Sequence, residues 1–265
     1  MSVNVLPAPF TKENLDDYLK DLAKEFRRLN GKAMPAEVIL IGGASILINY
    51  GFREVTYDVD AIIMASSAMK DAIRNTADKR GLKGDWFNTD FMRTSSYSNK
   101  LVEVSVYYKT YANILKIRTI AAEYLIAMKL VSGRRYKHDL SDIIGILQEH
   151  HVLGKPITKE LIDNAISLLY GDTVTLPESS HQILNALFNE SKTGVDYESL
   201  YAQSIENEKE AKELLVEFNK NNPKILTDKN HEEILDNLRT QKGATKKTLL
   251  GRLEKIRGSK NPPPD

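Results

Sequence analysis

The stretch VILIGGASILINYGFREVTYDVDAIIM, from Val38 to Met64, decides the fold that the sequence predicts. Its first apolar run ends at the pair Gly42–Gly43, and a second apolar run surrounds Asp58 and Asp60. Short apolar runs that end at glycine are typical of buried strands, and the apolar segment between the two runs is long enough for a short helix. We therefore interpret the stretch as a strand, a glycine turn, a helix and a second strand.

The two aspartates predict a metal site. Residues i and i+2 of a strand point to the same face, so the carboxylates of Asp58 and Asp60 should lie within reach of one cation. Carboxylate oxygens are the ligands that Mg²⁺ prefers. The glycines let backbone N–H groups approach a phosphate at a helix start, and Ser45 could add a hydroxyl donor.

A lone Asp-x-Asp sequence also occurs at solvated strand ends that bind no metal. Here Asp58 and Asp60 lie beside apolar residues on both sides. A buried carboxylate is costly unless it is paired or bound to metal, and two adjacent carboxylates repel each other without a cation. The combination of glycine turn and aspartate pair therefore favours a metal and phosphate site.

At this point the sequence resembles a known superfamily. Gly42–Gly43, then fourteen residues, then Asp58-Val-Asp60 is similar to the signature of nucleotidyltransferases with the polymerase-beta-like fold. The longer form GGAS…GFREVTYDVDAII is closer to the AbiEii and MenT group of toxin-like nucleotidyltransferases, where an arginine and a serine or threonine precede the aspartates. Arg53 and Thr56 hold those places here.

The resemblance implies a fold and an activity. The fold would be α/β (α+β), with a small mixed sheet flanked by helices and a helical C-terminal region. The activity would be transfer of a nucleoside monophosphate from a nucleoside triphosphate, with Mg²⁺ or Mn²⁺ as cofactor. Gly42, Gly43, Ser45, Arg53 and Thr56 would bind the nucleotide. The fork of an arginine guanidinium suits a triphosphate, although Arg53 could also pair with a local carboxylate.

A second motif lies further along the chain, in AEYLIAMKLVSGRRYKHDLSDI from Ala122 to Ile143. It is similar to a later motif of the same branch, and the resemblance implies catalytic roles for Lys129 and Asp139. Lys129 lies in an apolar helical run, where a lysine normally needs a partner or a phosphate. The alternative is a Lys129–Asp139 ion pair that only joins two helices, and Asp142 fits a structural role.

Members of the superfamily often carry a third carboxylate on a neighbouring strand. The alternating sequence LVEVSVYY predicts a strand at residues 101–108, and Glu103 is its one acidic residue. Glu103 is therefore a candidate metal ligand beside Asp58 and Asp60. The alternative is a glutamate that faces solvent from an edge strand.

The remainder of the chain predicts one mixed domain followed by helices. We expect a nucleotidyltransferase domain at 1–152, a helical domain at 153–258 and a disordered tail at 259–265. A weaker strand is predicted at 114–118, and 86–99 is interpreted as a loop with room for a short strand. The expected helices span 11–29, 66–80, 120–131, 138–150, 158–169, 179–189, 205–220, 229–240 and 245–256.

Composition narrows the class of protein. The chain has no cysteine, which excludes disulfides, cysteine–zinc sites and a thiol nucleophile and fits a cytoplasmic location. The sequence contains no apolar run long enough for a membrane helix, and we expect no signal peptide at its start. Residues 239–265 contain eight lysines and arginines against two acids. A solvated helical end is favoured there over a surface that grips RNA.

Together these features predict an Mg²⁺-dependent nucleotidyltransferase that modifies an RNA, such as tRNA, or a protein. It would be a toxin-like member of a toxin–antitoxin or phage-defence system, with a winged-helix antitoxin as a possible partner. Two alternatives stay open. One is a non-catalytic nucleotide- or partner-binding module of the same fold. The other is a small-molecule adenylyltransferase of the antibiotic-modifying type.

Overall fold

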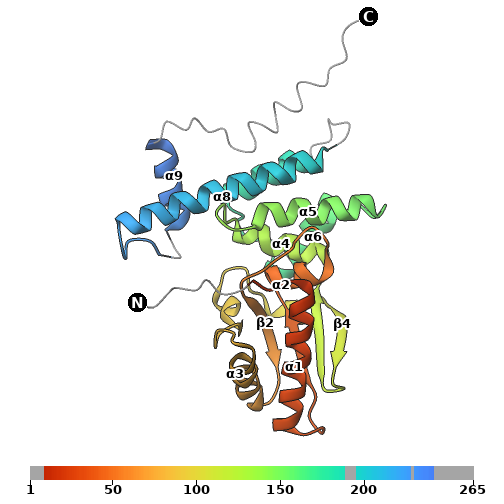
Figure 1. Cartoon of the computed structure of the whole chain (residues 1–265). Coiled ribbons are helices and arrows are strands. Elements are labelled where there is room, and N and C mark those ends of the chain that lie inside the picture. Colours follow the sequence, from red (N-terminus) through yellow and green to blue (C-terminus); the bar gives the residue numbers. More distant parts are fainter. Residues whose placement is uncertain (1–8, 189–194, 228–229, 242–265) are drawn as a thin grey trace, which may run out of the picture. The chain divides into compact units, whose positions relative to one another are not determined.

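The computed structural model describes residues 9–188, 195–227 and 230–241 (Figure 1). These residues form two compact units. The first contains residues up to Leu125 together with Ala165–Asp172, and the second contains Ile126–Asn164 and the described residues from Thr173 onward. The domain boundary near Val152 that the sequence suggests stays a prediction.

The first unit is built on a five-stranded mixed sheet in the order β3-β2-β1-β5-β4. β1 is antiparallel to β2 and parallel to β5, β2 is parallel to β3, and β4 is antiparallel to β5. This mixed sheet with flanking helices confirms the predicted α+β class. The elements in chain order are α1 (Lys12–Asn30), β1 (Ala36–Leu40), α2 (Gly42–Asn49), β2 (Val59–Met64), α3 (Ala68–Arg80), β3 (Phe87–Asn88), the 3₁₀ helices η1 (Asp90–Arg93) and η2 (Asn99–Val102), β4 (Ser105–Tyr111) and β5 (Leu115–Ile120).

Helices α1 and α3 cover one face of the sheet, as Figure 1 shows for α1 along its length. The strands contribute alternate apolar residues to this face, and all of those residues are buried (Val38, Leu40, Val59, Ala61, Leu115 and Ile117). Helix α1 begins where the sequence predicts. The Thr11 hydroxyl accepts from the Asn14 amide at 3.3 Å, and the Asn14 side chain accepts from the Thr11 amide at 2.9 Å, which forms a capping box.

The second unit is helical, as predicted for the C-terminal region. Helix α5 packs on α8, where the buried Glu208 accepts hydrogen bonds from the amide and hydroxyl of Ser141 at 2.9 and 2.7 Å. The helices of this half of the chain are α4 (Ala122–Ser132), α5 (Asp139–Val152), α6 (Lys159–Tyr170), α7 (Glu178–Phe188), α8 (Tyr197–Asn221) and α9 (His231–Gln241). None of the helices that the structure describes is both long enough and apolar enough to cross a membrane.

Two secondary-structure predictions are wrong. Residues 101–104 are not strand, because the chain forms η2 there and β4 begins only at Ser105. The Ser98 hydroxyl caps η2 by accepting from the Lys100 amide at 3.4 Å, and the Ser105 hydroxyl donates to the Val102 carbonyl at 2.7 Å. These local bonds compete with the strand that alternation alone favours.

The second error concerns α8, which begins at Tyr197 and not at 205. The Asp196 carboxylate accepts from the Ser199 amide at 3.1 Å and caps the helix eight residues earlier than expected. The helix predicted at 245–256 and the tail at 259–265 lie outside the described residues, as does most of the basic segment 239–265.

Candidate active site

The glycine pair opens helix α2 directly after β1. Gly42 has a φ of +54°, a conformation that glycine adopts without the steric cost a side chain would bring. The Ile41 amide donates to the Asp60 carbonyl at 2.9 Å. The start of α2 therefore lies beside the aspartate pair of β2, as the order of the motif predicts.

Gly43 is required for a different reason, which is close packing. A β-carbon at Gly43 would lie 2.6 Å from the Thr56 hydroxyl and 3.0 Å from the Arg53 Nη2 atom. Both side chains therefore pack on the glycine surface at the start of α2. The structure thus brings together three residues that the sequence suggested for nucleotide binding. It also puts a guanidinium beside the first amides of a helix, where a phosphate would bind.

The segment before the aspartates is held in place by Thr56. This residue is buried, and its hydroxyl donates to the Asp58 carbonyl at 3.3 Å. Its backbone pairs with Phe10 in both directions, at 2.9 and 2.7 Å. The Arg53 Nε atom donates to the Val55 carbonyl at 3.1 Å, which orients the arginine within the same segment.

The two aspartates lie at the beginning of β2, one just before the strand and one inside it. Asp58 immediately precedes the strand and is exposed, and Asp60 is its second residue and half-buried. Val59 and Ala61 are fully buried on the face covered by α1 and α3. Alternation therefore directs Asp60 to the opposite face, and Asp58 lies directly before the strand.

Two carboxylates suit a metal ion whose remaining coordination positions are filled by substrate oxygens and water. Among the described residues, no group of three or more His, Asp or Glu side chains is arranged to hold a metal ion. Mg²⁺ is commonly held by one or two carboxylates together with substrate phosphates and water. Asp58 and Asp60, with the glycine-led start of α2 beside them, fit that mode of binding.

Ser45 lies inside the first unit. Its side chain has no exposed surface, and its hydroxyl accepts from the Ile120 amide at 3.2 Å. This bond ties α2 to the end of β5 and so helps to position the glycine start of the helix. A direct contact between Ser45 and phosphate stays a prediction.

Glu103 is exposed and lies just after η2, not on a strand as the sequence suggested. The placement that made it a candidate is therefore wrong, because the capped turn at η2 replaces that part of the strand. It also belongs to no group of three metal-binding side chains in the described part of the chain. Its role as a ligand stays a prediction.

The structure reveals Asn88 as a neighbour of the site that the sequence did not single out. Strand β3 pairs with β2 in parallel, with Asn88 opposite Asp60. This strand lies in the 86–99 stretch, which was interpreted as a loop with room for a short strand and in which no site residue was named. The only signal in the sequence was the apolar pair Trp86–Phe87 followed by polar residues. This pattern is too short to predict which strand it pairs with.

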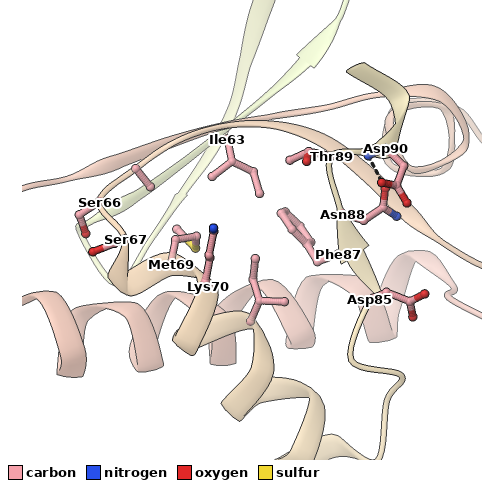
Figure 2. A pocket seen from close by; sticks show the side chains of 12 residues that line it. Ile63, Ser66, Ser67, Met69, Lys70, Asp85, Phe87, Asn88, Thr89 and Asp90 are labelled. Carbon is pink, nitrogen blue, oxygen red and sulfur yellow. Dashed lines mark hydrogen bonds between the residues drawn. The ribbon is translucent and has the colours of Figure 1, made fainter. Parts of the chain in front are cut away.

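A pocket of about 450 Å³ opens in the first unit beside β3 (Figure 2). Its apolar lining includes Ile63, Met69 and Phe87. Lys70 reaches toward it from α3, and Asn88 forms part of its wall. Met69 and Phe87 belong to the core under α1 and α3, so the pocket opens on that face of the sheet, and its lining includes neither Asp58 nor Asp60.

In the second unit, Lys129 forms a buried ion cluster. Its ammonium lies 2.9 Å from the Asp139 carboxylate and 2.7 Å from that of Asp142, and Arg134 donates to Asp139 at 2.9 Å. Burial alone would raise the pKa of Asp139, but Lys129 and Arg134 hold that pKa below its usual range. The cluster joins α4 to α5 in the way the structural alternative describes. Roles for Lys129 and Asp139 in the reaction stay predictions.

Comparison with known proteins agrees with this arrangement at the level of family. Residues 17–171, more than half of the 265-residue chain, match the model of a family described as a nucleotidyltransferase of unknown function (DUF6036). The chain therefore belongs to this family, and its place in the nucleotidyltransferase superfamily is confirmed. The matched segment contains the glycine pair, both aspartates, Lys129 and Asp139. No curated protein and no solved structure matches the chain.

Proposed function

We propose that the protein is a Mg²⁺- or Mn²⁺-dependent nucleotidyltransferase that transfers a nucleoside monophosphate from a nucleoside triphosphate. The observation that carries the proposal is the 2.9 Å bond between the Ile41 amide and the Asp60 carbonyl. This bond sets a glycine-led helix start next to β2, which has Asp58 directly before it and Asp60 as its second residue. Such a pair of features matches the two needs of the reaction, which are a phosphate cradle and a metal site.

The residues divide this work by their chemistry. The amides of Gly42 and Gly43 would donate to phosphate oxygens, and the Arg53 guanidinium would add charge at the same place. Asp58 and Asp60 would hold the metal, which supplies charge neutralisation during phosphoryl transfer. Thr56 would keep the two parts in register, because it contacts Gly43 and bonds to Asp58.

The acceptor and the biological role rest on the motif resemblance. We infer an RNA acceptor such as tRNA, or a protein hydroxyl, and a toxin-like role with a winged-helix antitoxin as partner. Lys129 and Asp139 would act on the triphosphate and the acceptor. The Lys129 ammonium is paired with the carboxylates of Asp139 and Asp142. To contact a phosphate, it would have to break one of these ion pairs or bind the phosphate in addition to them.

Calorimetric titration with each of the four nucleoside triphosphates, with and without Mg²⁺, tests the proposal. We expect metal-dependent binding of at least one nucleotide to the wild type. We expect the Asp58→Asn/Asp60→Asn double variant to lose that binding by tenfold or more. Asp163→Asn, an exposed aspartate paired with Lys159, is the matched control and should bind as the wild type does. Equal binding by the wild type and the double variant would overturn the proposal.

A further inference from the structure

Asn88 lies next to Asp60 on the neighbouring strand, and the register of the sheet fixes which way it faces. β2 and β3 are parallel, with Val59 opposite Phe87 and Asp60 opposite Asn88. Residues that lie opposite each other on paired strands point to the same face. Val59 and Phe87 are both buried on the face under α1 and α3, so Asn88 shares the other face with Asp60.

One hydrogen bond orients the side-chain amide of Asn88. Its Oδ1 atom accepts from the Asp90 amide at 2.9 Å, at the turn from β3 into η1 (Figure 2). The oxygen is thereby engaged, and the Nδ2 group is left to act as a donor. A donor beside a metal-binding carboxylate suits a phosphate oxygen and does not suit a cation.

The side chain is also reachable by a ligand. Asn88 is half-buried, so part of the residue is accessible to solvent. We propose that Asn88 is a further nucleotide-binding residue of the Asp58–Asp60 site, and that its Nδ2 group donates a hydrogen bond to a phosphate oxygen of the triphosphate. This inference rests on the proposed function.

A purely structural role for Asn88 and a nucleotide-binding role predict different effects of the same substitution. The turn into η1 uses only the side-chain oxygen, and an aspartate forms the same turn. Asn88→Asp should therefore preserve the fold in either case. In the ligand role it replaces the donor with a negative charge that repels phosphate, and it adds a third carboxylate next to Asp60.

The experiment measures two affinities on the full chain. The first is binding of the four nucleoside triphosphates with Mg²⁺, and the second is binding of Mn²⁺ alone, followed by its paramagnetic resonance signal. We expect Asn88→Asp to weaken nucleotide binding by about tenfold or more, since a hydrogen bond to a charged group contributes that much. The same variant should bind Mn²⁺ more tightly than the wild type, and Asn88→Ala should weaken nucleotide binding without this gain.

Thr89→Asp is the matched control. Thr89 is exposed, and the substitution adds the same negative charge one residue after Asn88. It should bind nucleotide nearly as the wild type does. The inference is overturned if both Asn88 variants bind nucleotide and Mn²⁺ like the wild type while the Asp58→Asn/Asp60→Asn variant does not; the proposed function then stands. If the wild type binds none of the four nucleotides, the proposed function and the inference fall together.

Discussion

Thr56 packs on Gly43 so closely that a β-carbon at the glycine would lie 2.6 Å from the threonine hydroxyl. This contact joins the two ends of the motif, the glycine start of α2 and the segment that leads into the aspartates. The same hydroxyl donates to the Asp58 carbonyl. Packing thus holds the glycine start of α2 against the segment that leads into the aspartates.

Gly43→Ala tests this contact. We expect it to lower the free energy of unfolding by about 1–3 kcal/mol, because an added methyl in a tightly packed place displaces its neighbours. In a Thr56→Ala background the opposing hydroxyl is gone, so the same substitution should cost clearly less. Urea denaturation of the four proteins gives the coupling energy of this double-mutant cycle.

Gly42→Ala is the control for that cycle. Nothing lies within 4 Å of a β-carbon at Gly42, but its φ of +54° makes a side chain unfavourable by about 1–2 kcal/mol. Its cost should be the same with or without Thr56→Ala. A cost of Gly43→Ala that is likewise independent of Thr56 would show that the close contact does not constrain the glycine.

The β4–β5 hairpin offers a stabilising substitution. Ala112 and Asn113 have φ values of +49° and +52°, and the Ile114 amide donates to the Tyr111 carbonyl at 3.1 Å across this two-residue turn. Alanine is unfavourable in this conformation and asparagine is tolerated. Ala112→Asn should therefore raise the free energy of unfolding by about 0.5–1 kcal/mol in urea denaturation.

Asn113→Ala is the reverse change in the same turn and should destabilise the protein by a similar amount. The Arg27 guanidinium donates to the backbone carbonyl of Ala112 at 3.0 Å. This bond involves no side-chain atom of residue 112 or 113, so both variants keep it. Loss of stability in Ala112→Asn as large as that in Asn113→Ala would contradict the assignment of strain to Ala112.

The ion cluster around Lys129 predicts a pH dependence of stability. The pKa of Asp139 is lower in the folded protein than in the unfolded chain. Its contribution to stability is therefore complete above the unfolded pKa of about 4 and is lost as pH falls below that value. Asp139→Asn should lower the free energy of unfolding by about 3–5 kcal/mol at pH 7, since it leaves buried charge with fewer partners.

The difference in the free energy of unfolding between the wild type and Asp139→Asn should narrow as pH falls from about 5 to 2, measured by urea denaturation. The control is Asp163→Asn, which removes the exposed partner of Lys159 and should cost about 0.5 kcal/mol or less at every pH. A constant difference between the wild type and Asp139→Asn over this range would contradict the assigned shift.

The sequence predicted the parts of this structure that depend on local pattern. The start of helix α1, the strand–helix–strand order around Gly42 and the helical second half follow from periodicity and glycine positions. The class of the fold and the superfamily followed from the same stretch.

The parts that escaped prediction depend on tertiary pairing or on side-chain bonds. The alternation at 101–108 predicted a strand throughout, but side-chain bonds at Ser98 and Ser105 accompany η2 in its first part, and β4 begins only at Ser105. The pairing of Asn88 with Asp60 depends on a two-residue strand whose partner no local pattern specifies. No local pattern specifies the partner of Ser45 either, because its buried bond to the Ile120 amide joins residues far apart in the chain.

The most direct test of the central claim is transfer itself. The full chain is incubated with Mg²⁺, each α-labelled nucleoside triphosphate, and either total tRNA or a protein extract, and the label in each macromolecule is measured. We expect label from at least one nucleotide in one acceptor class with the wild type. The Asp58→Asn/Asp60→Asn variant should lose this transfer by a hundredfold or more, while Asp163→Asn retains it. Nucleotide binding without transfer to any acceptor would point to a non-catalytic module, and transfer that survives loss of both aspartates would contradict the account.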